Sequence, residues 1–165
     1  MTTASEDLRI KDWLDGRLPD DWFESFTLTG DREELTITGT LTEPESGSEE
    51  GRSGRIRRFR EETRPTRITI AQELEQSTGR KVTWAATCGD TTRVFTRLTV
   101  PVMTRLAQPQ RKVLDTLVES GVARSRSDAL AWCVRLVEEH EEDWLRELDA
   151  ALTAVREVRS QGPKS

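Results

Sequence analysis

Residues 97–130 read RLTVPVMTRLAQPQRKVLDTLVESGVARSRSDAL, and this stretch decides how we interpret the fold. Aliphatic and polar residues alternate at its start, which is the period-two pattern of a β-strand. Apolar residues then recur every three or four positions, which predicts a short helix that ends at Ser120-Gly121. Ser125 and Asp128 form a capping-box pattern, so a second helix is predicted to begin there.

The second helix is predicted to be long. Its apolar residues continue at spacings of three and four, with Glu141 as a polar break. About 34 residues at 1.5 Å per residue give a helix of roughly 50 Å, which projects beyond a small core. We therefore expect its apolar stripe to pack against a second copy or back along the same chain. The stripe comprises Leu130, Val134, Val137, Trp144, Leu148, Ala151, Val155 and Val158.

Residues 22–42 predict an antiparallel hairpin near the start of the chain. Two β-rich runs, 25–28 and 35–38, flank a turn at 30–33. Large apolar residues alternate with polar ones, so one face is expected to be buried while threonines face water. The predicted buried side chains are Phe26, Leu28, Leu35, Ile37 and Leu41.

A basic helix and a second hairpin follow. Residues 55–79 predict a helix that is interrupted near Pro65 and ends at Gly79. Residues 82–100 return to period two around a turn at 89–92, which predicts two further strands. The predicted apolar face of the helix includes Ile68, Ala71 and Leu74. Between the first hairpin and this helix, residues 43–54 contain no apolar side chain and predict a flexible linker.

The charge distribution is uneven along the chain. The 165 residues carry a net charge of −5, but residues 1–50 carry −10, residues 51–126 carry +9 and residues 127–165 carry −4. A basic middle segment of this kind points to nucleic acid or to an acidic partner within the same molecule, and a solvated charged surface is the alternative. The cluster of Arg52, Arg55, Arg57, Arg58 and Arg60 is either a phosphate-tracking arm or a solvated helix face.

Several classes of protein are not favoured by the sequence. Cys88 and Cys133 lie 45 residues apart without metal-ligand spacing, so reduced thiols are expected instead of a disulfide or a zinc site. A metal at His140 and Cys133 would lack two further ligands. No nucleophile, acid–base pair or phosphate loop has a catalytic pattern, so we expect no enzyme and no cofactor. No apolar run is long enough for a membrane span, and a cytoplasmic protein is expected.

The order of elements in residues 97–137 resembles the ribbon-helix-helix family of bacterial and phage DNA-binding proteins. The chain has a short alternating strand at 97–102, a first helix, a glycine turn at Gly121 and a helix that starts with Ser125-Arg126-Ser127-Asp128-Ala129-Leu130. In that family two copies pair their strands into an antiparallel ribbon that enters the DNA major groove, and the helices form an intertwined dimer core. Pro101 departs from the pattern because it cannot donate a ladder hydrogen bond.

The resemblance implies specific roles for residues of this chain. Alternation along the strand places Arg97 and Thr99 on the outer face as the base-reading candidates. The start of the second helix is expected to hold DNA phosphates, because free amides and the helix dipole favour anions there. The predicted phosphate contacts are Arg124, Ser125, Arg126 and Ser127. The predicted dimer interface comprises Leu98, Val100, Val102, Leu130, Val134 and Val137.

The expected fold class is therefore α+β: a small N-terminal unit of hairpin, helix and hairpin, followed by a ribbon-helix-helix with a long, coiled-coil-like C-terminal helix. The expected domains are an acidic hairpin region at 1–42, the linker at 43–54, the basic helix and hairpin at 55–96, and the dimerisation and DNA-binding module at 97–159. The expected function is a homodimeric bacterial regulator of transcription that binds duplex DNA.

Three other hypotheses remain at this point. The chain could be an antitoxin-like interaction protein whose acidic N-terminus binds a protein partner and whose C-terminal helices only dimerise. It could bind RNA through the central unit, with Trp84 or Phe95 stacking on bases. The acidic N-terminal segment could also mask the basic segment of the same chain.

Overall fold

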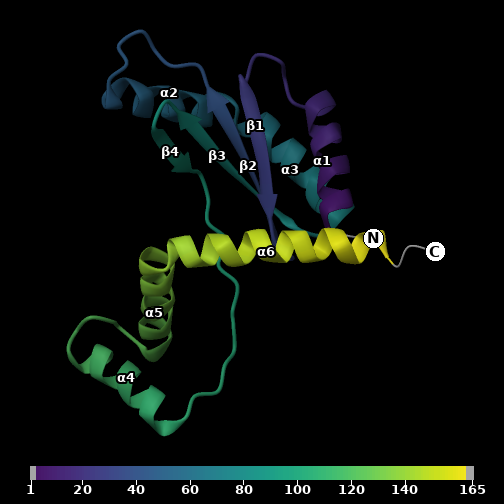
Figure 1. Cartoon of the computed structure of the whole chain (residues 1–165). Helices are drawn as coiled ribbons and strands as arrows, with labels where there is room; N and C mark the ends of the chain where they lie inside the picture. The colour runs from purple at the N-terminus through teal and green to yellow at the C-terminus, as the bar shows by residue number, and fades with distance from the viewer. Residues whose placement is uncertain (1–2, 163–165) are drawn as a thin grey trace. The chain divides into compact units, whose positions relative to one another are not determined.

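The chain folds as two units, Met1–Pro101 and Val102–Ser165, and each is described by itself. The computed structural model describes residues 3–162, with side chains from Glu6 onward. The first unit contains α1 (Thr3–Arg17), β1 (Ser25–Gly30), β2 (Glu34–Leu41), α2 (Glu49–Glu62), α3 (Arg64–Thr78), β3 (Lys81–Cys88) and β4 (Thr91–Val94). The second contains α4 (Gln108–Glu119), α5 (Arg126–His140) and α6 (Glu142–Gln161). The mixed α+β class is confirmed (Figure 1).

A four-stranded sheet in the order β1-β2-β3-β4 organises the first unit (Figure 1). Both predicted hairpins form, since β1 pairs antiparallel with β2 and β3 pairs antiparallel with β4. The two hairpins are joined by parallel pairing of β2 with β3, in which Leu35 lies opposite Val82 and Leu41 opposite Cys88. Parallel neighbours need a long crossover connection, and α2 with α3 supplies it.

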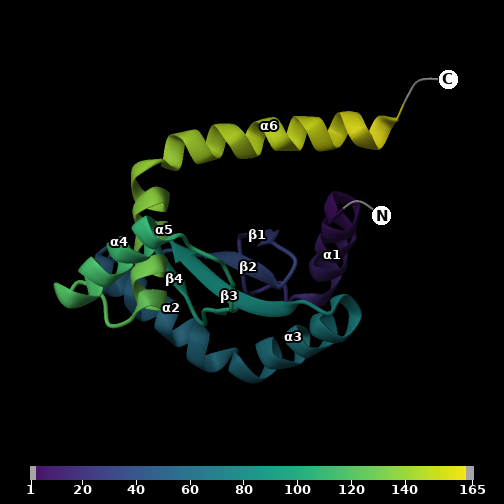
Figure 2. The same ribbon diagram turned by 90° about the horizontal axis from the view of Figure 1, so that it is seen from below.

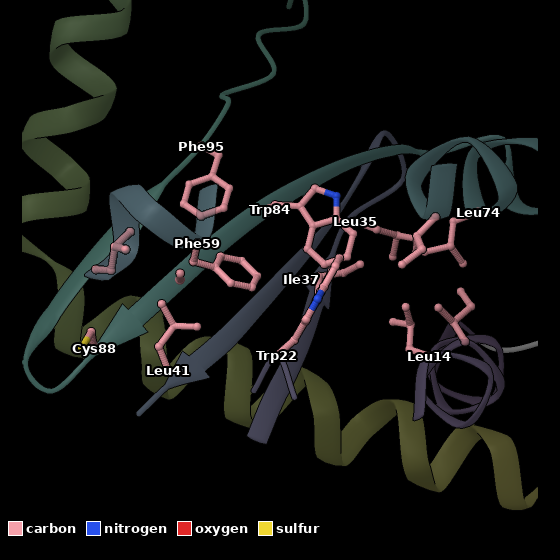
Figure 3. Close-up of a cluster of buried hydrophobic side chains, with 14 residues drawn as sticks. Leu14, Trp22, Leu35, Ile37, Leu41, Phe59, Leu74, Trp84, Cys88 and Phe95 are labelled. Atoms are coloured by element: carbon pink, nitrogen blue, oxygen red, sulfur yellow. The ribbon is translucent and has the colours of Figure 1, made fainter. Parts of the chain in front are cut away.

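The core of this unit lies on one face of the sheet. Every second side chain of β2 is buried on this face, and Trp84, Ala86 and Cys88 of β3 join the same core with residues of α1, α2 and α3, because side chains alternate between the faces of a strand. Figure 2 shows α2 and α3 following one another along the sheet. The opposite face carries mainly threonines, as expected from the sequence. The core comprises Ile10, Leu14, Trp22, Leu35, Ile37, Leu41, Ile56, Phe59, Ile70, Leu74, Trp84, Ala86, Cys88 and Phe95 (Figure 3).

The expected linker at 43–54 is helical from Glu49 onward. Ser48 caps the helix, since its hydroxyl oxygen accepts a hydrogen bond from the amide of Gly51 at 3.1 Å. Glu49 lies in the first turn, where the helix dipole stabilises a negative charge. The polar start of α2 is held in place by apolar residues two to three turns further on, and these residues, Ile56 and Phe59, are buried. The prediction of a flexible linker is therefore wrong for residues 49–54.

Helix α1 was not expected from the sequence. From Glu6 onward, two of its side chains, Ile10 and Leu14, are buried in the core, and charged residues surround them. Such a sparse apolar pattern carries little helical periodicity. Its charged residues do contribute to packing, because Arg17 forms a bidentate ion pair with Glu73 of α3 at 2.9 Å.

The single long C-terminal helix is also a wrong prediction, because the chain bends at Glu141 between α5 and α6. Glu141 has φ −117° and ψ 25°, which are not helical values. Acidic residues surround this point, including Glu138, Glu142 and Asp143. In a continuous helix Glu138 would face Glu142, and Glu139 would face Asp143, at a spacing of four, and the repulsion within each pair disfavours that arrangement.

Residues 97–102 do not form a strand within this chain. After β4 ends at Val94, one further ladder bond joins the Phe95 amide to the Trp84 carbonyl at 2.8 Å. The chain then continues without helix or strand until α4 begins. A strand needs a neighbouring strand for its backbone groups, so a ribbon at 97–102 requires a second copy and stays a prediction.

We expect Gly39→Ala to destabilise the first unit by roughly 2 kcal/mol, because it overpacks a filled site. A Cβ at Gly39 of β2 would lie 2.0 Å from the Phe23 ring. That ring cannot move freely, since Trp22 and Phe59 pack on it with centroid separations of 5.9 and 5.0 Å. Thermal unfolding of both variants tests this. Gly54→Ala is the control, because a Cβ there meets nothing within 4 Å, and an equal loss in both would contradict the argument.

Candidate nucleic-acid interface

The second unit is a helical hairpin that continues into α6. Helix α4 ends at a turn where Gly121 adopts φ +79°, a left-handed conformation that favours glycine. The amides of Val122 and Ala123 return hydrogen bonds to the Leu117 carbonyl, at 3.0 and 3.1 Å. The glycine turn predicted between the two helices is thus confirmed.

A small apolar core fixes α4 against α5. Leu114, Ala123 and Ala129 are buried, and further residues are partly buried around them. Ala129 is fully buried, so its small side chain allows the start of α5 to approach α4 closely. The surrounding residues are Leu106, Leu117, Val118, Leu130 and Cys133. The core orients the first turn of α5, where the predicted phosphate contacts lie.

Ser125 is the N-cap of α5, as the sequence predicts. Its hydroxyl oxygen accepts a hydrogen bond from the Asp128 amide at 3.1 Å. The Asp128 carboxylate reaches back and accepts a hydrogen bond from the Arg124 amide at 3.0 Å. The amides of Arg126 and Ser127, in the first turn of α5, have no acceptor within the helix and stay available to an anion.

The guanidinium of Arg126 is already engaged by a carboxylate of α4. Its Nε and Nη2 donate to the two oxygens of Asp115 at 2.6 and 2.8 Å. These hydrogen bonds from Arg126 lower the pKa of the Asp115 carboxyl below its ordinary value, and the same pair raises the pKa of Arg126. Stability from this pair is therefore present above the ordinary pKa of an aspartate and is lost as the pH falls through the lowered one.

Arg124 is freer than Arg126. Its side chain is 95% exposed, and its Nε lies 3.8 Å from the Asp128 carboxylate. Ser127 is exposed as well. The structure thus brings the four predicted phosphate-contact residues together at one end of α5, with Arg124 and Ser127 open to solvent and Ser125 and Arg126 in protein contacts.

The base-reading candidates, Arg97 and Thr99, belong to the first unit, whereas the phosphate candidates belong to the second. Both side chains are exposed. Their aliphatic neighbours are exposed too: Leu98 by 37%, Val100 by 47% and Val102 by 84%. An extended segment that exposes alternating aliphatic residues has unsatisfied apolar surface, which is what one half of a ribbon would show.

The other predicted interface residues, on α5, differ in exposure. On α5, Val134 is 62% and Val137 is 48% exposed, while Leu130 is half-buried. Helix α6 has no buried residue at all. Its exposed apolar residues are Trp144, Leu145, Leu148, Leu152, Val155 and Val158. Spacings of three and four place these residues along one stripe, as at a helix–helix interface.

Several acidic residues of the N-terminal segment form ion pairs with arginines of the first unit. Arg80, whose side chain is 7% exposed, lies 3.1 Å from Asp7 and 3.8 Å from Glu6. Arg52 pairs with Glu43 and with Asp90. Because residues 1–50 also include α1, β1 and β2, the acidic segment is an integral part of this fold.

The predicted basic cluster at residues 52–60 lies on α2 and is divided among different environments. Arg57 and Arg58 form exposed ion pairs one turn along the helix, with Glu61 and Glu62. Arg52 is largely buried and paired. These residues therefore do not form one free arm.

Asp115 is the residue of this interface that the sequence did not reveal. It lies 11 positions before Arg126 and on a different helix, so no local spacing connects the two. The sequence shows only that an acidic residue lies on the helix before the basic capping motif. This is a weak signal for an ion pair between the two.

We expect Asp115→Asn to strengthen binding of the chain to duplex DNA. The change frees Arg126 and removes a negative charge from the same surface. With two copies, the slope of log K against log salt should steepen by about 2. Fluorescence anisotropy with duplex DNA at several salt concentrations measures this slope. An unchanged slope would mean that Arg126 does not contact phosphate.

Two family models match this chain, one in each structural unit, and the gap between the two matches contains the boundary between the units. Residues 8–94 match the family model described as "Rv1265-like protein, N-terminal domain", and residues 107–159 match "Mb1296 C-terminal domain". The intervening residues 95–106 contain the segment without helix or strand.

Two curated relatives match nearly the whole chain. The protein Mb1296 of Mycobacterium bovis and the protein Rv1265 of Mycobacterium tuberculosis are each 56% identical over 156 residues, which cover 92% of this chain and 69% of the relative. Both are described as uncharacterised. No solved structure gives a significant match. The N-terminal match spans more than half of the chain, and it and the high identity show that this chain belongs to the Rv1265-like family.

Proposed function

We propose that the protein is a homodimeric DNA-binding protein and a regulator of transcription. In this proposal residues 97–102 of two copies pair as an antiparallel ribbon that reads bases in the major groove. The N-terminus of α5 in each copy binds phosphates beside it. The protein binds DNA without catalysing a reaction and without a cofactor.

The observation that carries the proposal is a group of unpaired cations on α4 and in the segment just before it. Arg105, Arg111 and Lys112 are exposed, and none has an ion pair among residues 6–162. Residues 102–127 carry a net charge of +3, whereas residues 128–162 carry −5. The positive charge thus gathers in the segment before α4, on α4 and in the turn before α5, where phosphate contacts are proposed. The acidic α5 and α6 remain for other contacts.

The burial of aromatic residues argues against the RNA-binding alternative. Stacking on a base needs an open ring face, but Trp84 is only 4% exposed and Phe95 only 8% exposed. One observation favours the interaction-protein alternative: the apolar stripe of α6 is exposed and could bind a protein partner. It differs from our proposal in predicting no affinity for DNA.

The test is binding of the full chain to genomic duplex fragments at 50 and 200 mM salt, together with its mass in solution. For six to ten phosphate contacts, the affinity should fall by about 10³–10⁵-fold between these salt concentrations. A mass of two chains and a smaller affinity for single-stranded RNA are expected. No binding, or binding that ignores salt, would contradict the proposal.

Base reading is tested separately with Arg97→Ala and Thr99→Ala. Each should reduce the preference for the best fragment over a scrambled one by about 1–3 kcal/mol per contact, since base contacts specify and phosphate contacts do not. The preference is measured by competition with unlabelled scrambled duplex. Arg93→Ala is a control, because it changes an exposed arginine of β4 outside the proposed ribbon. Unchanged preference in both variants would place base reading elsewhere.

A further inference from the structure

A second positively charged site lies in the first unit, where α2 and α3 pass over β3. A groove of about 620 Å³ is lined there by four arginines of these helices and by Trp84 and Phe95. Its volume falls within the range of small-molecule sites, roughly 300–1,000 Å³. Nothing in the DNA-binding proposal uses this groove.

Arg67 forms the buried part of the groove. It is 7% exposed, and its guanidinium carbon lies 4.7 Å from the centroid of Phe95 and 5.9 Å from that of Trp84. Its hydrogen bonds go to neutral oxygens, from Nε to the Thr63 hydroxyl at 3.0 Å and from Nη2 to the Arg60 carbonyl at 2.6 Å. Burial, with Arg60 and Arg64 nearby, lowers the pKa of Arg67 to about 10, so it stays charged at neutral pH.

Three of the four arginines of the groove, Arg60, Arg64 and Arg67, lack counter-ions in the described part of the chain. Arg60 donates to the Phe95 carbonyl at 3.2 Å, and its guanidinium carbon lies 5.6 Å from the Phe95 centroid. Among residues 6–162, no carboxylate lies within ion-pair distance of Arg60, Arg64 or Arg67. Glu61, the one acidic residue in the lining, pairs with Arg57. A buried cation without a counter-ion costs free energy, which an anion in the groove would recover.

Trp84, one of the lining residues, also carries an unused hydrogen-bond donor. The indole Nε1 of Trp84 is buried and has no acceptor in the described part of the chain. Such unsatisfied donors are rare and call for an explanation.

We infer that this groove binds a small organic anion with a flat apolar body. Arg60, Arg64 and Arg67 bind its phosphate or carboxylate group. The aliphatic part of the lining, formed by Ile68, Ala71 and Val82, packs against its body. Arginine suits this role because its planar guanidinium binds oxyanions through two hydrogen bonds and also stacks on rings.

The test uses the full chain and probes that separate the two halves of the ligand. Phenyl phosphate and benzoate carry both a ring and an oxyanion, whereas inorganic phosphate and phenol carry one each. Calorimetric titration should show saturable binding of phenyl phosphate or benzoate, at least about tenfold tighter than inorganic phosphate or phenol. The tighter of the two shows whether the anionic group is phosphate or carboxylate.

Variants locate the binding. Arg60→Gln with Arg64→Gln should weaken it about tenfold to a hundredfold, the effect of losing a hydrogen bond to a charged group. Arg58→Gln is the matched control, because Arg58 is an exposed arginine of α2 that does not line the groove. Arg64→Gln alone gives a second test if the double variant unfolds, since Arg64 is exposed and does not contribute to the core.

The indole resonance of Trp84 in a ¹⁵N–¹H spectrum, assigned with Trp84→Phe, should shift on titration with the tighter probe. A lack of saturable binding by either ring-bearing anion would overturn the inference. It would also be overturned if Arg58→Gln reduced binding as much as Arg64→Gln. The probes contain no DNA, so the result is independent of the proposed function.

Discussion

Replacing Arg124 and Arg126 together by glutamine is expected to weaken DNA binding on the order of a thousandfold at 0.1 M salt. Each phosphate contact contributes about 0.9 to the slope of log K against log salt, so four lost contacts in a dimer reduce the slope by roughly 3.6. Both arginines lie at the capped N-terminus of α5, where free amides add to the positive potential. Anisotropy titrations at several salt concentrations measure both quantities.

The loss should be equal for specific and scrambled duplexes, because phosphate contacts carry no sequence information. Arg135→Gln is the matched control, since this exposed arginine lies further along α5, away from its N-terminus. It should lower affinity little. If the double variant bound as tightly as the unmodified chain, the proposed phosphate site at α5 would be wrong.

The second large effect is expected from Val134→Glu with Val137→Glu, which should convert the dimer to a monomer. Both valines are exposed within one chain, so the variant should still fold. At about 1.5 kcal/mol or more for each buried valine, the four in a dimer contribute roughly 6 kcal/mol, or on the order of 10⁴-fold in the dissociation constant. Sedimentation over a range of concentrations measures the change.

The same variant should lose DNA binding, because the ribbon needs two copies. Arg135→Glu introduces an acidic side chain on another side of the same helix and should remain dimeric. A dimer that survives the double valine change would show that α5 is not the interface. The stripe of α6 would then be the next surface to test.

Local patterns predicted much of this fold. The alternation of Leu35, Ile37 and Leu41 identified a buried strand face, and the cap at Ser125 placed the start of α5 correctly. Both signals work because they depend on residues a few positions apart. The join between the two hairpins has no such signal, since the parallel pairing of Leu35 with Val82 depends on a whole crossover.

The buried face of α3 shows why one part of the prediction failed. The apolar pattern favoured Ile68 and Ala71, but Arg67 and Ile70 are buried instead, and Ile68 is 46% exposed. An arginine is rarely expected in a core. Here the rings of Phe95 and Trp84 accept its guanidinium, and these residues come from distant positions in the sequence.

The candidate interface was predictable only in part for a related reason. The capping motif located the residues at α5, but the ion pair of Arg126 with Asp115 depends on how α4 packs against α5. The unpaired segment at 97–102 stays a prediction, since strand pairing there would be intermolecular.

The parallel pairing of β2 with β3 has a consequence for how the first unit folds. Each hairpin links residues close in sequence, and such contacts form within microseconds. Leu35 and Val82 pair only when the chain between them, which includes α2 and α3, closes into a loop. Closing this loop costs conformational entropy before the contacts between β2 and β3 can compensate for it. We expect the two hairpins to form early and the central strands to join them last, so this joining step sets the folding rate.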